Sequence, residues 1–512
     1  MVFADLHLEL QRLPAPLPIW HACVDRAGWS VLAGKVAQAH GRLLSVWGRH
    51  GSGGASACAA FATTEGLLWA ELPLAGAKDR YPDLSATFAC ATRMQRSLAD
   101  LGGLQADTAS DRRPWLDHGL WATAAPLASG VTPAGAAVGT WPADYPFVRV
   151  EGDGVHEIAV GPVHAGIIEP GHFRFSVVGE KVLRLEQHLG YVHKGIERRF
   201  TELPPLQAFR LAGRVSGDST VAFAWAYAMA LESCCGTAVP ERADWLRALM
   251  LERERVANHL GDLGALGNDA ALAFGLAQFS RLREDWQRLS QRAFGHRFMM
   301  DAVVPGGVAG DLPLSLREEQ RRQCDEVERE VQRLRHVYDE HAGLQDRFMG
   351  TGRVVPELAA RLGLAGLAGR ASGQAVDLRH DHAWQPYRTL QARIATQHGG
   401  DVAARVALRF DELAESLRLI RELCARLPEG GTAGAIELPG RAMQGAGWVE
   451  GWRGEVLVAL SLGADGHIER CHCHDPSWQN WPVLEHAVIG NIVPDFPLIN
   501  KSFNLSYSGV DL

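Results

Sequence analysis

The pattern of apolar and polar positions predicts long helices in the middle of the chain. Residues 245–264 and 315–342 carry apolar side chains at three- and four-residue spacings, as amphipathic helices do. Residues 401–427 repeat this pattern, and residues 221–231 are apolar on all sides, which indicates a buried helix too short to cross a bilayer. Several long helices together favour a bundle core.

Alternating patterns predict strands on both sides of this core. Within residues 171–180 apolar and polar side chains alternate, and a Gly-Glu-Lys turn leads into another apolar run, so we expect a hairpin. Residues 447–462 and 467–474 predict strands near the C-terminus, with a turn at Asp465 and Gly466 between them.

Residues 1–123 are predicted to form a first unit with its own helices and strands. Residues 58–61 and 67–72 are apolar runs of strand length, whereas residues 31–46 and 91–101 have helical patterns.

A change in composition marks the expected domain boundary. Residues 124–146 are rich in Ala, Gly and Pro and are predicted to be a linker, which leaves residues 147–512 as the second domain. The predicted fold class is α+β: a small N-terminal α/β unit followed by a helical-bundle core that β segments flank.

Composition narrows the class of protein. The chain has 512 residues, 47% hydrophobic and 21% charged, which is the balance of a globular protein. The net charge of −8 and the absence of a basic tail argue against a nucleic-acid partner. The start of the chain lacks a basic stretch followed by an apolar run, and the nine cysteines show no disulfide spacing, so we expect a cytoplasmic protein.

A run of potential metal ligands lies near the C-terminus. Cys471, His472, Cys473 and His474 follow one another and precede Asp475. In a strand the cysteines would face one way and the histidines the other, so one ion could not bind all four. The pattern favours a structural role, and a metal contact remains the alternative.

A second polar cluster surrounds the predicted hairpin. His164, Glu169, His172 and Arg174 lie between turn signals and could line a pocket. The alternative is a set of ordinary hydrogen-bonded surface residues.

A third cluster alternates acid and base. Asp377, Arg379 and Asp381 would share one face of an extended segment, where they could form a buried ion network or a proton path. A surface salt-bridge loop is the competing interpretation. The chain has no phosphate-binding loop, no HExxH and no paired CxxC, so residue patterns alone indicate no particular enzyme class.

Several motifs, in order, resemble those of one family. Residues 155–200 and 252–262 resemble the large subunit of energy-converting NiFe hydrogenases of the formate hydrogenlyase type and the 49-kDa-type subunit of respiratory complex I. The motifs Val-Val-Pro-Gly-Gly-Val at 303–308 and Met-Gly-Thr-Gly at 349–352 continue the resemblance, which covers residues 145–512.

The first unit is similar to another complex I subunit. The motifs Tyr-Pro at 81–82, Ala-Thr-Arg-Met-Gln-Arg at 91–96 and Arg-Pro-Trp-Leu at 113–116 resemble the 30-kDa-type subunit. This resemblance implies that residues 1–123 are a 30-kDa-like domain fused ahead of the large subunit.

The chain departs from the hydrogenase pattern at the metal ligands. The family holds nickel and iron with two cysteine pairs, and the resemblance places the first pair at Ser216 and Ser219 and the second at Ser477 and Asn480. Hydroxyl groups are poor nickel ligands beside thiolates. We therefore expect no metal and no other cofactor bound by this chain. A tail that continues to Leu512 is also expected of a nickel-free member.

The resemblance implies an acceptor site in the vacated cavity. In complex I this cavity forms part of the quinone site, and His172 matches the histidine that contacts the quinone. The matching tyrosine is absent here because its position falls near Gly217 or Asp218, so Asp218 is the substitute proton donor in this hypothesis. The other expected cavity residues are His164, Glu169, Arg174, Ser216, Ser219, Ser477 and Asn480, and the expected coupling residues are Asp377, Arg379 and Asp381.

The leading hypothesis is an electron-transfer subunit of a complex I-like assembly, an oxidoreductase active only within the complex. The expected partners are a small subunit with an iron–sulfur cluster, membrane-arm subunits and quinone, with no nucleic acid. The expected location is the inner face of the cell membrane, on which partner subunits hold the chain.

Two alternatives remain open. A non-catalytic scaffold could couple a redox partner to an ion-pumping arm. A hydrogenase with unusual ligands, such as Cys234 and Cys235 or Cys471 and Cys473, is the less favoured hypothesis.

Overall fold

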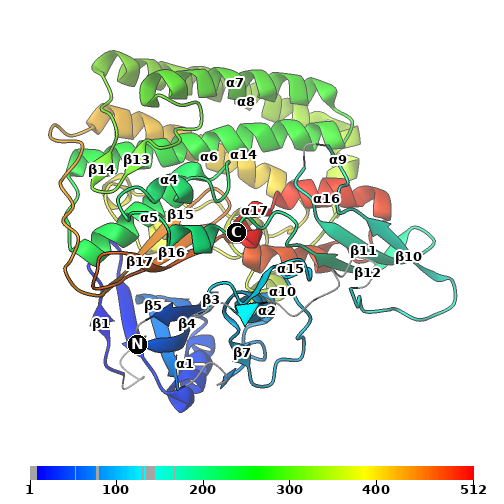
Figure 1. Cartoon of the computed structure of the whole chain (residues 1–512). Helices are drawn as coiled ribbons and strands as arrows, with labels where there is room; N and C mark the ends of the chain where they lie inside the picture. The colour runs from blue at the N-terminus through cyan, green and yellow to red at the C-terminus, as the bar shows by residue number, and fades with distance from the viewer. Residues whose placement is uncertain (1–7, 52, 76–79, 129–131, 134–144, 167) are drawn as a thin grey trace.

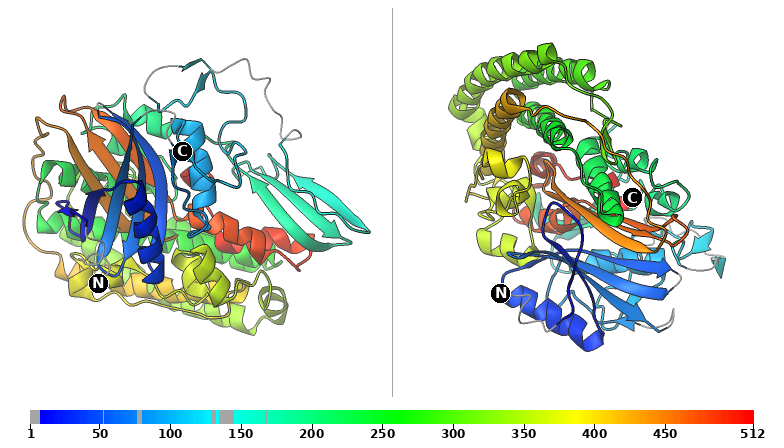
Figure 2. Two further views of the ribbon diagram at one scale, coloured as in Figure 1. Left: turned by 90° about the horizontal axis from the view of Figure 1, so that it is seen from below. Right: turned by 90° about the vertical axis from the view of Figure 1, so that its left-hand side faces the viewer.

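The computed structural model describes residues 8–51, 53–75, 80–128, 132–133, 145–166 and 168–512. It has the predicted α+β architecture, with long helices above, a small sheet beneath them and a second sheet below (Figure 1). Seen from the side, the C-terminal sheet lies between the helices and the N-terminal sheet (Figure 2).

The long helices form where the apolar spacing predicts them. α8 buries Val327, Val331 and Leu334, which recur at three- and four-residue intervals, while its charged side chains face outward. α5 is buried on nearly all sides because it packs between α6 and the C-terminal sheet. These helices are α5 (Thr220–Cys235), α6 (Glu241–Asp269), α7 (Ala273–Phe294), α8 (Leu314–Glu340) and α14 (Val402–Arg426).

The C-terminal sheet is antiparallel. Its order is β15 (Met443–Glu450), β16 (Glu455–Leu462) and β17 (Ile468–His474). Alternation along β17 places Cys471 and Cys473 in the core, whereas His472 points to the N-terminal sheet.

The N-terminal sheet has the order β1-β2-β5-β4-β3, and α2 packs on β3. Its elements are β1 (Gln11–Arg12), β2 (Ile19–Cys23), α1 (Arg26–Gln38), β3 (Arg42–Gly51), β4 (Gly54–Thr63), β5 (Gly66–Leu74) and α2 (Ala91–Gly102).

The helix predicted for residues 31–46 is wrong in its second half. α1 ends at Gln38, His40 adopts a positive φ of 56°, and the chain re-enters as β3. Leu43 and Val46 belong to the core between this sheet and its helices, so sheet pairing overrides the local helical pattern.

The first unit packs closely against the rest of the chain. The rings of Trp47 on β3 and His472 on β17 stack with centroids 4.7 Å apart. Arg470 Nε donates to Gly48 O at 2.8 Å. The predicted linker 124–146 lies partly outside the described residues, so the boundaries 1–123 and 147–512 stay a prediction.

The elements nearest the candidate site are a hairpin and the C-terminal helices. The hairpin β11–β12 belongs to a three-stranded antiparallel sheet with β10, and this sheet projects from the body of the molecule (Figures 1 and 2). These elements are β10 (Val155–Val160), β11 (His172–Val178), β12 (Lys181–His188), α15 (Ser477–Ala487), α16 (Phe496–Phe503) and α17 (Ser508–Asp511).

Shorter elements complete the fold. They are β6 (Arg80–Tyr81), β7 (Gln105–Ala106), β8 (Thr123–Ala124), β9 (Thr132–Pro133), α3 (Ile196–Phe200), α4 (Phe209–Ala212), β13 (Val303–Val304), β14 (Gly307–Val308), α9 (Ala342–Phe348), α10 (Pro356–Leu362), α11 (Gly366–Ala371), α12 (Leu378–Asp381), α13 (Tyr387–Leu390) and the 3-10 helix Val493–Asp495. Within the described ranges, no helix combines the length and apolar character needed to span a membrane.

Candidate functional site

The loop before α5 (residues 216–219) meets the C-terminal segment of the chain (residues 504–512). Ser216 Oγ donates to Asp218 Oδ1 at 2.9 Å and lies 2.9 Å from Ser506 Oγ. Ser506 also receives a hydrogen bond from Gly509 N at 2.8 Å. Two residues separate Ser506 from Gly509, as two residues separate Ser216 from Ser219. We call Ser216, Asp218, Ser219, Ser477 and Ser506 the serine cluster.

The structure joins Ser477 to this cluster and places Asn480 elsewhere. Ser477 Oγ accepts from Ser506 N at 2.9 Å. Asn480 instead makes hydrogen bonds in both directions with the backbone of Ala365, at 3.0 and 3.2 Å. Ser506, not Asn480, therefore faces the first pair of predicted positions. The three-residue spacing of Ser506 and Gly509 is the sequence signal that could have found it.

An arginine from the C-terminal sheet binds the serine cluster. Arg453 lies in the turn between β15 and β16, and its guanidinium contacts Asp218 in bidentate fashion at 2.8 and 2.5 Å. Its Nη1 also donates to Ser219 Oγ at 3.2 Å. Burial alone would raise the pKa of Asp218, but Arg453 and Ser216 outweigh it and the pKa is lowered. A carboxylate held ionised in this way is a poor proton donor, so the geometry does not favour that role for Asp218.

The donor set of the cluster does not fit a nickel–iron centre. Its side chains offer hydroxyl and carboxylate oxygens that hydrogen-bond one another, and it contains no thiolate. The alternative cysteines do not help, because the only described group of three or more His, Cys, Asp or Glu ligands that converge is His21, Cys23 and Glu71.

His164 and Glu169 lie against the C-terminal segment. Glu169 Oε2 accepts from Ser508 N at 3.2 Å. The ring of His164 lies 6.3 Å from that of Tyr507, and its buried Nε2 has no hydrogen-bond partner among the described residues. Both residues are thus neighbours of the residues that flank Ser506.

His172 and Arg174 lie on β11 and instead contact β10 and the glycine that follows it. His172 Nδ1 lies 3.3 Å from Gly161 O, and Arg174 Nη1 donates to Glu157 at 3.0 Å. Burial, together with the charge of Arg174, lowers the pKa of His172, so the imidazole is neutral. The described hydrogen bonds of His172 and Arg174 do not reach the serine cluster.

Asp377 and Arg379 form a buried ion network, as one interpretation of the sequence expected, and not a surface salt-bridge loop. Arg379 pairs with Asp377 at 2.6 Å and with Glu252 at 3.1 Å. Glu252 also accepts from Tyr387 and Ser416, at 2.8 and 2.7 Å. Asp377, Arg379 and Glu252 are at most 2% exposed, so each charge depends on its partners.

Asp381 lies at the edge of this network. Its side chain is 33% exposed, accepts from Asp377 N at 3.0 Å and pairs with His380. The segment forms a helical turn at α12, not the extended strand assumed from alternation, so Asp381 does not share a buried face with Asp377.

Charged residues that the sequence interpretation missed extend the network towards the serine cluster. Arg370 bridges Glu412 and Glu450 at 2.7 and 2.9 Å. His259 lies 3.1 Å from Glu412. Further on, Asp262 pairs with Arg409 and accepts from Asn504, whose carbonyl accepts from Arg453 Nε.

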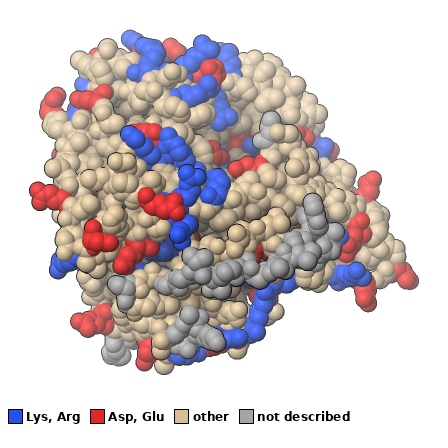
Figure 3. Space-filling model, in the orientation of Figure 1, with Lys and Arg blue, Asp and Glu red and all other residues tan. Residues whose placement is uncertain are grey.

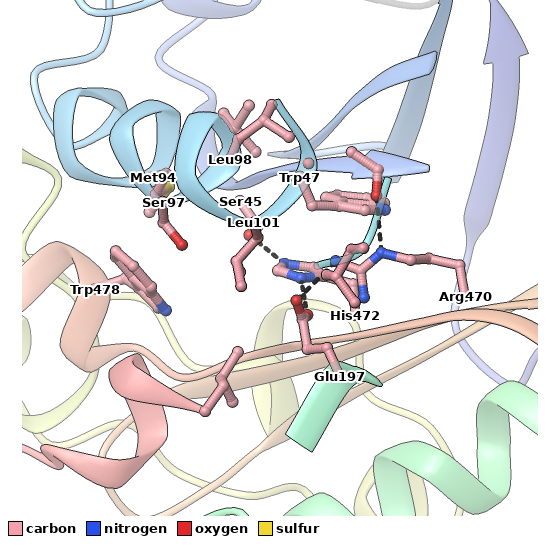
Figure 4. Close-up of a pocket in the computed structure, with 15 residues that line it drawn as sticks. Ser45, Trp47, Met94, Ser97, Leu98, Leu101, Glu197, Arg470, His472 and Trp478 are labelled. Atoms are coloured by element: carbon pink, nitrogen blue, oxygen red, sulfur yellow. Dashed lines mark hydrogen bonds and ion pairs between the residues drawn. The ribbon is translucent and has the colours of Figure 1, made fainter. Parts of the chain in front are cut away.

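A small cavity and a larger groove illustrate the range of cavity sizes in the described residues. A cavity of about 20 Å³ separates the N-terminal sheet from β17, where Glu197 binds His472 and Arg470 (Figure 4). It has room for about one water molecule. A groove of about 470 Å³ runs past Asp218, Asp262 and Lys501 between α6, α7 and α16. The groove has the volume of a small-molecule site, and so does a pocket of about 430 Å³ lined by β3, α10 and α11.

Comparison with known proteins identifies relatives in two kinds of complex. Residues 262–444 match the family described as the 49 Kd subunit of respiratory-chain NADH dehydrogenase. The chain is 31% identical to the carbon monoxide-induced hydrogenase of Rhodospirillum rubrum, over 68% of this chain and 97% of that protein. It is 30% identical to an NADH-quinone oxidoreductase subunit of Rhizobium etli, over 55% of this chain and 71% of that protein.

Two further proteins are similar to this chain. Formate hydrogenlyase subunit 5 of Escherichia coli is 33% identical over 72% of this chain, and the chain spans 65% of that protein's length. A chain in the structure of the membrane-bound sulfane sulfur reductase, an archaeal respiratory membrane complex, is 24% identical with a TM-score of 0.65, over 70% of this chain and 98% of that chain. This last likeness supports the fold. Together these findings place the chain in the family of large subunits shared by energy-converting hydrogenases and the 49-kDa-type subunits of complex I.

Proposed function

We propose that this chain is a nickel-free electron-transfer subunit of a membrane-associated, complex I-like oxidoreductase. The observation that carries this proposal is the serine cluster, because the hydroxyls of Ser216, Ser219 and Ser477 stand at three of the four positions where the resemblance places thiolates. Electrons would come from an iron–sulfur cluster in a partner small subunit. The acceptor would be a quinone or another oxidant, and the protein would be active only within the assembly.

The surface supports a partner beside the serine cluster. A band of Lys and Arg side chains crosses the middle of the face on which α4 and the C-terminus lie (Figure 3). Arg198, Arg199 and Arg210 on α3 and α4 are exposed, close in sequence to Ser216. Membrane-arm subunits would hold the chain at the inner face of the membrane.

The acceptor site is tested by replacing His172. His172→Ala in the native assembly is expected to lower the rate of quinone-analogue reduction by about tenfold or more, because a buried neutral imidazole beside Arg174 would be lost. The iron–sulfur signal of the partner, measured by EPR, checks that the assembly stays intact. An unchanged rate would remove His172 from the acceptor site.

A scaffold role is the second candidate, and the closure of the serine cluster favours it. Ser216, Ser477 and Ser506 hydrogen-bond one another instead of facing an open cavity. A scaffold predicts that Asp218→Asn and His172→Ala both leave acceptor reduction unchanged, while removal of the whole chain abolishes it.

A further inference from the structure

A compact set of metal-binding side chains lies in the N-terminal sheet, on β2 and β5. His21 Nε2, Cys23 Sγ and one carboxylate oxygen of Glu71 all lie within 4.8 Å of one another. β2 and β5 are parallel, with Cys23 opposite Glu71 and His21 opposite Trp69. Because side chains alternate along a strand, His21 and Cys23 share the face on which Glu71 projects.

The donor atoms suit a borderline-soft divalent ion. Zn²⁺ binds imidazole nitrogen, thiolate sulfur and carboxylate oxygen, and sites with three protein ligands keep a fourth position open. Of the nine cysteines, all of which lie in the described ranges, only Cys23 is exposed. An ion bound here could therefore take its fourth ligand from solvent.

The surrounding groups prepare Glu71 as a ligand. Arg49, His21 and Gln444 all contact the carboxylate of Glu71. Both hydrogen bonds from Arg49 go to Oε1. Oε2 faces His21 Nε2 at 3.2 Å and accepts from Gln444 Nε2 at 2.8 Å. Such outer hydrogen bonds fix the orientation of a metal-binding carboxylate.

We propose that His21, Cys23 and Glu71 form a zinc site, unrelated to the vacated nickel position. The ion would displace the proton of the Cys23 thiol, and His21 would bind it through Nε2 as a neutral imidazole with its proton on Nδ1. Gln444 on β15 donates a hydrogen bond to Glu71, so the zinc site would lie at the contact between the N-terminal and C-terminal sheets. Because a thiol must lose its proton to bind the ion, binding should release a proton and strengthen as pH rises.

Cobalt titration of the full-length chain tests this proposal, because Co²⁺ bound to a thiolate gives a characteristic charge-transfer absorption. We expect one Co²⁺ per chain, displaced by Zn²⁺, and stronger binding at higher pH. Cys23→Ser should abolish the absorption band. The matched control Cys235→Ser, which alters a half-buried cysteine at the end of α5, should keep it.

Alkylation of Cys23 gives a second readout. Zn²⁺ should protect Cys23 from iodoacetamide in the unaltered chain, and His21→Ala should remove that protection. Circular dichroism shows whether His21→Ala folds; if it does not, exposed Cys23→Ser decides the question. Absence of a thiolate band in the unaltered chain, or a band unchanged in Cys23→Ser, would overturn the zinc site.

Discussion

The Asp218–Arg453 pair is the residue-scale feature that most clearly distinguishes this site from a thiolate centre. Arg453 satisfies both carboxylate oxygens and also contacts Ser219 and the carbonyl of Asn504. An arginine with this many partners holds the loop before α5 to the C-terminal sheet.

Removing Arg453 should therefore destabilise the protein. Arg453→Met leaves Asp218 without its cation, and we expect a loss of about 3 kcal/mol in the free energy of unfolding, measured with urea. Arg198→Met is the matched control, because Arg198 is exposed and its pair with Glu202 lies on the surface. Equal effects of the two substitutions would show that the Asp218 pair does not stabilise the fold.

Asp511 gives the chain a pH dependence of stability. Its carboxylate accepts from Gly190 N and Val192 N, yet burial raises its pKa to about 7. The folded state thus binds a proton that the unfolded state releases near pH 4, so this contribution to stability is complete below about pH 4 and is lost as pH rises through about 7.

Asp511→Asn should remove this dependence, since the amide does not ionise. Urea midpoints measured between pH 5 and pH 8 should fall with rising pH more steeply in the unaltered chain than in the variant. Parallel slopes would mean that Asp511 does not titrate in this range.

At the scale of elements, α6 shows why part of the site was not predicted from the sequence. Glu252, Arg255 and His259 are completely buried on this helix, where they meet partners from α12, α14 and β15. A run of charges on a helix usually indicates a solvated face. Only the distant partners reveal that these charges are inside.

The predicted elements themselves depend on local signals and were largely recovered. The three-residue spacing of α8 and the alternation in β11 arise from single elements. The turn at His40 and the contact of Ser216 with Ser506 arise from tertiary packing. For this reason the second half of the 31–46 helix was wrong and the position of Ser506 was missed.

The two aspartates of the predicted coupling group should behave differently. Asp377→Asn leaves buried Arg370 and Arg379 short of one charge, so we expect a loss of about 3 kcal/mol or more in the free energy of unfolding. Asp381→Asn, which alters the partly exposed member, should cost less than about 1 kcal/mol. Chemical denaturation of both variants measures the difference, and a costlier Asp381→Asn would contradict the buried network.

At the scale of the whole molecule, the two sheets and the C-terminal segment act as one packed unit. Trp47 and His472 join the sheets, and Asp511 and Ser506 tie the segment to loops far away in the sequence. This packing fixes the serine cluster between loops and helices that lie far apart in the sequence.

The measurement that tests the central claim most directly is the nickel content of the purified native assembly, normalised to this chain. We predict no nickel, together with iron from the clusters of partner subunits, because serine hydroxyls occupy three of the four positions that the resemblance assigns to thiolates. Nickel near one atom per chain would contradict this prediction, because the serine cluster offers no thiolate to bind it.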